Sequence, residues 1–188
     1  MQRLGRILLH RGDAAGAETL IAEALRVATI TNAEWTLPSN LEALGACALA
    51  RGDGRRAAAL LAECLTMIRD GWGIFGPVRS YSFFWFTAAG CLESLGMIAA
   101  GIGEDEPAGR LCGAADALRE RRGERSSALQ EARLERAISP MRNGRGGVAF
   151  TTAWAAGRAL SPEAACDEGR AFAAGVIAAA PRRRTKFG

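Results

Sequence analysis

Lysine, histidine and tyrosine are almost absent from this chain of 188 residues, which has one of each: Lys186, His10 and Tyr81. Because the only lysine lies near the C-terminal end, there is no G-x-x-x-x-G-K-[ST] motif and no nucleotide-binding P-loop. One histidine and scattered cysteines make neither a zinc site nor a Cys–His nucleophile. No paired catalytic groups recur at a defined spacing, so the sequence argues against an enzyme and predicts no catalytic, cofactor-binding or metal-binding residues.

Valine and isoleucine are also few, whereas alanine, leucine and arginine dominate. This balance favours helix over sheet. Of the 24 basic residues, 23 are arginine, and the net charge of +4 is mild for a chain of this length. Such a charge does not by itself imply a nucleic-acid partner.

No C-x-x-C pair is present, and the five cysteines are spread singly at positions 47, 64, 91, 112 and 166. We interpret them as reduced, buried small hydrophobic residues of a cytoplasmic protein. No signal peptide is expected, because Arg3, Arg6 and Arg11 interrupt any apolar run at the N-terminus. The segment Phe83–Ile102 is long enough to span a membrane, but Glu93 lies within it, where a carboxylate costs about 2.5 kcal/mol or more. We therefore expect no membrane span.

An internal repeat is the strongest pattern in the sequence. Laid over Leu44–Leu65 at an offset of 40, the segment Leu4–Leu25 is identical at eleven positions without a gap. The identical pairs are Leu4/Leu44, Gly5/Gly45, Leu9/Leu49, Arg11/Arg51, Gly12/Gly52, Asp13/Asp53, Ala17/Ala57, Leu20/Leu60, Ala22/Ala62, Glu23/Glu63 and Leu25/Leu65. Self-similarity at such a period is typical of a solenoid.

A third copy begins at Leu95-Gly96, and the spacing within each copy resembles the tetratricopeptide pattern of paired helices. Positions +12, +16 and +19 from the repeat glycine are Ala17, Ile21 and Ala24, then Ala57, Leu61 and Cys64, then Ala108, Cys112 and Ala115. We predict an all-α, tetratricopeptide-like superhelix of about eight or nine helices in antiparallel pairs. The predicted single domain covers residues 1–178, with repeats at about 4–30, 36–70 and 83–122, closing helices at 126–178, and a basic flexible tail at 179–188.

The tripeptide Arg-Gly-Asp occurs at residues 11–13 and 51–53. It can serve as an adhesion tag on extracellular proteins, but its place in the repeat indicates a turn between two helices. Gly12 and Gly52 supply a left-handed end to the first helix, and Asp13 and Asp53 cap the N-terminus of the second. In the third copy, residues 103–107 have a similar role.

Three segments carry a family resemblance: "LGACALARGDGRRAAALLAECL" (Leu44–Leu65), "EPAGRLCGAADALRERRG" (Glu106–Gly123) and "FTTAWAAGRALSPEAACDEG" (Phe150–Gly169). They resemble the C-terminal helical-repeat region of large bacterial signalling ATPases and LuxR-type transcriptional regulators. That resemblance implies a sensing or partner-binding superhelix beside an ATPase module and a DNA-binding helix-turn-helix. Neither a P-loop nor a convincing helix-turn-helix is found here, so the chain would correspond to the repeat module alone.

Between the second and third copies the offset grows from 40 to 51, so eleven residues are added. We place them in a loop at Asp70–Ser82, because glycine and proline punctuate this stretch. Seven of the 12 aromatic residues gather there and just after it: Trp72, Phe75, Tyr81, Phe83, Phe84, Trp85 and Phe86. They form either a groove or dimer face, or a helix wedged between two core layers. We predict that Trp72, Phe75 and Tyr81 line a pocket or contact face, with Phe84 and Trp85 beside them.

In the tetratricopeptide phase, six positions line a groove: Arg6, His10, Ser39, Glu42, Glu93 and Met97. Their mixed charge suits a peptide or a small polar ligand. The alternative is a solvated face, and His10 has the further alternative of an exposed residue that caps its helix.

The sequence therefore predicts a non-catalytic protein–protein interaction or ligand-sensing module of a bacterial regulatory protein. We expect a homodimer that forms through the aromatic segment or the first helix pair. The alternative function is a nucleic-acid-associated transcriptional regulator that uses arginine clusters, including Arg182, Arg183 and Arg184 in the tail.

Overall fold

The protein is all-helical over the part of the chain that a computed structural model describes, which is residues 1–71, 81–121, 123, 127–144 and 146–179, without the side chains of residues 71 and 81–83. These residues form nine α-helices and one short 3₁₀ helix, and no strand. The elements are α1 Gln2–His10, α2 Ala14–Ile30, η1 Glu34–Thr36, α3 Leu37–Ala50, α4 Gly54–Gly71, α5 Tyr81–Ile102, α6 Asp105–Glu120, α7 Ala128–Arg142, α8 Gly147–Arg158 and α9 Pro162–Ala178. The prediction of an all-α fold in antiparallel helix pairs is confirmed.

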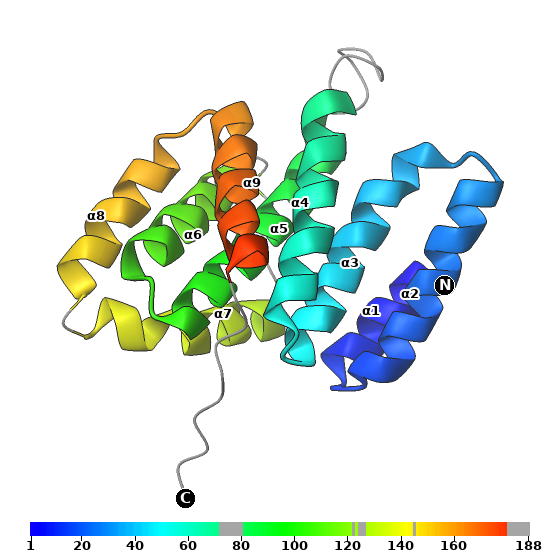
Figure 1. Cartoon of the computed structure of the whole chain (residues 1–188), viewed down its shortest axis with the longest axis horizontal. Helices are drawn as coiled ribbons and strands as arrows, with labels where there is room; N and C mark the ends of the chain where they lie inside the picture. Colours follow the sequence, from blue (N-terminus) through cyan, green and yellow to red (C-terminus); the bar gives the residue numbers. More distant parts are fainter. Residues whose placement is uncertain (72–80, 122, 124–126, 145, 180–188) are drawn as a thin grey trace, which may run out of the picture.

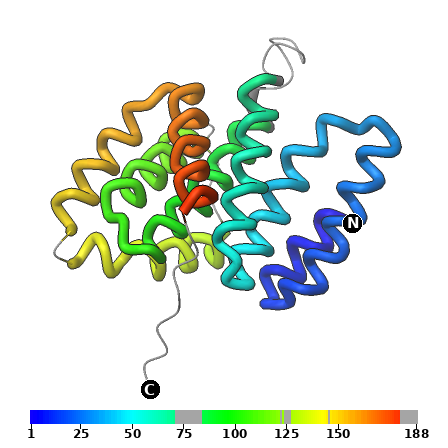
Figure 2. Tube along the Cα trace, viewed as in Figure 1, coloured from blue at the N-terminus to red at the C-terminus, as the bar shows by residue number. Residues whose placement is uncertain are grey.

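The pairs α1–α2, α3–α4 and α5–α6 follow one another across the molecule in chain order (Figures 1 and 2). Helix α8 packs on α6 beyond the third pair, and α9 returns to pack against α4, α5 and α6. Helix α7 runs crosswise to α5 and packs against both α5 and α8 (Figure 1). The C-terminal helices thus cover the third pair on more than one side.

The core is divided among three neighbouring clusters of buried side chains. The largest joins α3, α4, α5, α6 and α9, and it includes Leu65, Leu92 and Leu95, all fully buried. A smaller cluster joins α1, α2 and α3, and a third joins α5, α6, α7 and α8. Burial of apolar surface at about 25 cal/mol per Å² is the main stabilising contribution in such an arrangement.

Within each of the first three pairs, one glycine of the first helix faces a side chain of the second helix at very short range. The contacts are Gly5 with Ile21, Gly45 with Leu61 and Gly96 with Cys112, where an added Cβ would lie 2.5, 2.7 and 2.4 Å from the facing side chain. A Cβ does not fit at these distances, so glycine lets the two helices approach closely. The spacing of sixteen residues seen in the sequence thus corresponds to an equivalent helix contact three times.

Helices α6 and α8 approach more closely still. A Cβ on Gly113 of α6 would lie 2.2 Å from the backbone oxygen of Trp154, and one on Gly157 of α8 would lie 2.0 Å from that of Arg110. Backbone atoms cannot move aside as the end of a side chain can, so these glycines determine how α8 sits against the third pair.

Both Arg-Gly-Asp tripeptides form turns between paired helices, as predicted. Gly12 and Gly52 have φ of +90° and +81°, the left-handed conformation that favours glycine. An Asp13 carboxylate oxygen accepts a 2.8 Å hydrogen bond from the Gly16 amide, and Asp53 accepts one of 3.0 Å in the equivalent place. The third turn keeps the left-handed glycine at Gly103, with φ of +83°, but lacks a side-chain cap.

The predicted loop at Asp70–Ser82 is wrong at both ends, because α4 continues to Gly71 and α5 begins at Tyr81. Each helix extends its hydrogen-bonded ladder past the point where the glycine-rich composition suggested a break. The remainder of that loop, residues 72–80, lies outside the described residues.

All five cysteines are free and buried, as predicted. Burial raises the pKa of the Cys47 thiol to about 11 and that of Cys166 to about 12. Loss of hydration disfavours the thiolate in both cases, so these side chains act as small apolar core residues at neutral pH.

Within the described ranges, one helical segment, Phe84–Ile102, is apolar and long enough to cross a membrane. In this protein 67% of that stretch is buried by the surrounding helices. A core helix passes the same test of length and composition, so the segment is weak evidence for a span.

Replacing Gly52 tests the turn between α3 and α4. We expect Gly52→Val to lower the free energy of unfolding by about 1–2 kcal/mol, because a β-branched residue resists a positive φ. A Cβ at this position would meet nothing within 4 Å, so the loss reports backbone strain alone. Urea unfolding followed by circular dichroism measures it. Asp53→Glu abolishes the tripeptide and should leave the fold intact; an unchanged stability of Gly52→Val would contradict the turn assignment.

Candidate functional site

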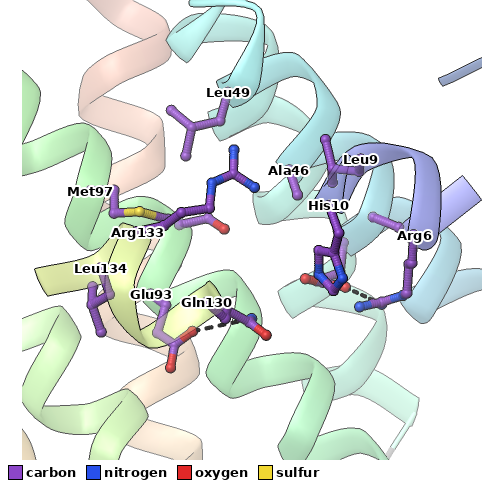
Figure 3. A pocket seen from close by; sticks show the side chains of 13 residues that line it. Arg6, Leu9, His10, Ala46, Leu49, Glu93, Met97, Gln130, Arg133 and Leu134 are labelled. Atoms are coloured by element: carbon purple, nitrogen blue, oxygen red, sulfur yellow. Dashed lines mark hydrogen bonds and ion pairs between the residues drawn. The ribbon is translucent and has the colours of Figure 1, made fainter. Parts of the chain in front are cut away.

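One pocket opens between helices α1, α3, α5 and α7 (Figure 3). Its lining residues are Arg6, Leu9 and His10 of α1, Glu42, Ala43, Ala46 and Leu49 of α3, Glu93, Ser94 and Met97 of α5, and Gln130, Arg133 and Leu134 of α7. Five of the six groove positions predicted from the repeat lie here: Arg6, His10, Glu42, Glu93 and Met97. The sixth, Ser39, is buried, and its backbone oxygen accepts a 3.4 Å hydrogen bond from Arg6.

The first carboxylate of the pocket, Glu42, pairs with Arg6 of the preceding first helix. Only 6% of the Glu42 side chain is exposed, against 30% for Arg6. Gly90 of α5 makes room for Glu42, because a Cβ there would lie 2.8 Å from the Glu42 Oε1 atom. The pair therefore joins α1 to α3 at a point where α5 also comes close.

The second carboxylate, Glu93, forms a two-pronged pair with Arg119 of α6. The Nε–Oε1 and Nη2–Oε2 distances are 2.5 and 2.7 Å, and both side chains are at least 90% buried. The Arg119 guanidinium also lies 5.1 Å from the centre of the Phe86 ring, within reach of a cation–π contact. Gln130 of α7 donates a weaker hydrogen bond of 3.4 Å to Glu93. This cluster holds α5, α6 and α7 together behind the pocket.

Two basic groups of the pocket are not engaged in this way. Among the residues that the structure describes, no hydrogen bond or ion pair involves the half-buried Arg133 guanidinium or the exposed His10 ring. Figure 3 shows Arg133 reaching from α7 across the pocket toward Ala46 and Leu49. Arg133 therefore presents hydrogen-bond donors to whatever enters the pocket.

Two of the aromatic residues predicted for the site, Phe84 and Trp85, lie outside the pocket. Phe84 is 7% exposed and belongs to the largest core cluster, and the half-buried Trp85 packs against the same cluster, so neither lines the pocket. The expectation of a contact surface at Phe84 is therefore wrong, because its ring fills space between helices. Tyr81 begins α5, but its side chain is outside the described part of the chain, as are Trp72 and Phe75.

Sequence reasoning missed the contribution of α7 and the role of Arg119. Gln130, Arg133 and Leu134 come after the third repeat copy, where the repeat spacing predicts nothing. Arg119 is followed by Arg121 and Arg122 in the sequence, a charged stretch that suggests a solvent-exposed segment, yet Arg119 is buried. The available signal was Glu93, the only charged residue in a long apolar helix, since a buried carboxylate requires a cationic or hydrogen-bonding partner.

Comparison of the chain with protein-family models, with curated proteins and with solved structures finds no match. Within the described ranges, no group of three or more His, Cys, Asp or Glu side chains could hold a metal ion. The pocket combines two paired carboxylates, two basic groups that have no ion-pair partner among the described residues, and an apolar lining.

Removing Arg119 tests the buried pair behind the pocket. We expect Arg119→Met to lower the free energy of unfolding by about 3–5 kcal/mol, because Glu93 is left buried without its partner. The double variant Glu93→Met with Arg119→Met should recover most of this loss, since it removes both buried charges. Urea unfolding of the single and double variants provides the comparison. A cost below about 1 kcal/mol for Arg119→Met would argue that Glu93 is solvated in solution.

Proposed function

We propose that this chain is a non-catalytic interaction module of a bacterial regulatory protein: a tetratricopeptide-like superhelix whose inner face binds a segment of a partner protein or a small polar ligand. The observation that carries the proposal is the composition of the pocket. The first helix of each of the three pairs, α1, α3 and α5, lines it, and none of the second helices does. In stacked helix-pair repeats, equivalent helices line one concave surface, and that surface binds partners.

Three further observations support the repeat interpretation. The first two pairs are related by the offset of 40 in sequence, the pairs share an equivalent glycine contact, and their turns share a left-handed glycine. Pairs with the same contact and turn geometry are expected to stack in similar orientation. The resemblance to the helical-repeat region of LuxR-type regulators agrees with this arrangement.

The volume of the pocket also suits part of a larger ligand. Its cavity volume is about 60 Å³, several times what one water molecule requires. That space suits one polar side chain or end group of a longer ligand that continues along the inner face. Apolar residues such as Leu9, Met97 and Leu134 supply contact area, while the charged groups supply orientation.

A nucleic-acid partner receives less support. Arg182, Arg183 and Arg184 lie outside the described residues, and Arg119, which lies close to Arg121 and Arg122 in the sequence, is buried in its pair with Glu93. A buried arginine cannot contribute to phosphate binding.

Filling the pocket tests the proposal. Peptides would be selected on the immobilised protein from a random phage-displayed library, and their affinities measured by fluorescence anisotropy. We expect Ala46→Phe, which places a ring in the pocket from α3, to weaken binding about tenfold or more. The matched control is Ala59→Phe at an exposed position of α4. Equal affinities of the two variants, with native circular dichroism spectra, would overturn the inner-face assignment.

We further propose that the chain self-associates through helix α1. Leu4 and Ile7 are 52% and 48% exposed, although the equivalent residues of α3, Leu44 and Cys47, are buried in the core shared with α2. The face of α3 that carries Leu44 and Cys47 therefore packs against another helix, whereas the equivalent face of α1 is exposed. A second copy of the chain supplies such a surface by symmetry.

The double variant Leu4→Glu with Ile7→Glu tests self-association. Light scattering at high micromolar concentration should give the mass of a dimer for the wild type and of a monomer for the variant, because charge in an apolar interface is costly. Thr19→Glu, at an exposed position of α2, should remain dimeric. A wild-type protein that is monomeric under these conditions would rule out the α1 interface.

A further inference from the structure

We infer that the ligand of the pocket carries a carboxylate, which Arg133 binds, next to an apolar group that packs on Met97 and Leu134. This inference deepens the proposed function, because it rests on the inner face being a binding surface. It identifies the partner as an acidic peptide segment, with either a C-terminal carboxylate or an Asp or Glu side chain as the bound group.

Both carboxylates that line the pocket are already neutralised by arginines. Glu42 is paired with Arg6, and Glu93 with Arg119. Neither carboxylate can therefore attract a cationic ligand without giving up its arginine, and for the buried Glu93–Arg119 pair that exchange is costly. The apparent acidity of the pocket is therefore cancelled by its own arginines.

Arg133 is a charged residue of the pocket lining that belongs to neither of these two ion pairs. Arg133 lines the pocket and is half-buried as a residue, and its guanidinium makes no ion pair or hydrogen bond with any residue in the described part of the chain. A guanidinium offers five N–H donors in a fixed fork that matches a carboxylate in a two-pronged pair. With two balanced pairs and one further cation, the pocket carries a net positive charge and favours an anion.

The lining around Arg133 indicates what the carboxylate is attached to. Ala46 and Leu49 of α3, Met97 of α5 and Leu134 of α7 are apolar, and Figure 3 shows the guanidinium reaching toward Ala46 and Leu49. Such surroundings reduce competition from water and strengthen a charged hydrogen bond. They also suit an apolar side chain adjacent to the carboxylate. An inorganic anion would leave this apolar surface uncovered, so an acidic peptide is the better fit.

The volume of the pocket is also consistent with a bound carboxylate. A cavity of about 60 Å³ admits a carboxylate and part of an adjoining side chain, but not a folded domain. The remainder of a peptide would lie along the inner face, past His10 on one side. Arg133 then determines where along the peptide the acidic group must be.

The four methionines provide a direct probe, since Met97 lines the pocket and Met1, Met67 and Met141 do not. The full chain would be labelled with ¹³C at the methionine methyl groups and titrated with three compounds to about 50 mM, because ligands this small bind in the millimolar range. N-acetyl-leucine presents a terminal carboxylate, N-acetyl-glutamic acid α-amide presents a side-chain carboxylate, and N-acetyl-leucinamide presents neither. We expect a carboxylate compound to shift the Met97 signal at about tenfold lower concentration than the amide, and the compound that does so identifies the source of the carboxylate.

Variants of α7 assign the effect to Arg133. Arg133→Gln should abolish the preference for carboxylate over amide, a loss of about tenfold or more, while binding of the amide is unchanged. Arg133→Lys should retain part of the preference, because it keeps the charge without the fork. Arg136→Gln, at an exposed position three residues along the same helix, is the matched control and should behave as wild type.

Each failure has a separate meaning. Equal shifts with N-acetyl-leucinamide and N-acetyl-leucine would overturn the carboxylate inference but leave the inner-face function supported by the Met97 response. A carboxylate preference that survives in Arg133→Gln would overturn the role of Arg133. Absence of any Met97 shift would also overturn the inference, whereas the proposed function would still be decided by the selected peptides and the Ala46→Phe variant.

Discussion

The close approach of paired helices at glycine is the constraint on which the rest of the structure depends. At Gly5, Gly45 and Gly96 a first helix comes so close to its second helix that an added Cβ would force the facing side chain to shift. Because the contact recurs at the same place in three pairs, the pairs can lie side by side in the same orientation. The first helices α1, α3 and α5 then come together on one surface, and that surface contains the pocket. A pocket made from residues far apart in sequence therefore follows from helix contacts outside the pocket.

Charge on the inner surface imposes a second requirement. Glu42 and Glu93 are buried where first helices meet, and a buried carboxylate is stable only with a partner. Arginines from different helices, Arg6 of α1 and Arg119 of α6, supply those partners. Desolvation offsets much of the attraction within a buried pair, whereas the loss of one partner leaves an uncompensated buried charge. Arg133 also lines the pocket but belongs to neither pair.

Much of the fold could be predicted from local pattern. The turn glycines and the capping aspartates identified where helices end and begin, because positive φ and orphan N–H groups are properties of short segments. The repeat register also identified five pocket residues before any helix was placed, since equivalent positions in stacked pairs face the same way. The repeat register makes no prediction for residues that follow the third copy. Helix α7 belongs to no repeat, so its side chains Gln130, Arg133 and Leu134 could not be assigned to the pocket.

By itself, the sequence determined the helix pairs, their turns and the candidate inner face, because each depends on spacing along the chain and on the conformational preferences of glycine and aspartate. Only the tertiary structure decided which charges are neutralised. Arg119 and Arg133 look alike in sequence, yet one is buried against Glu93 and the other lines the pocket. Only the tertiary structure decided, likewise, that the Phe84 side chain lies in the core. The reason is physical: a side chain's partner and its exposure depend on how α7 and the closing helices pack, and that packing arises from contacts between residues distant in sequence.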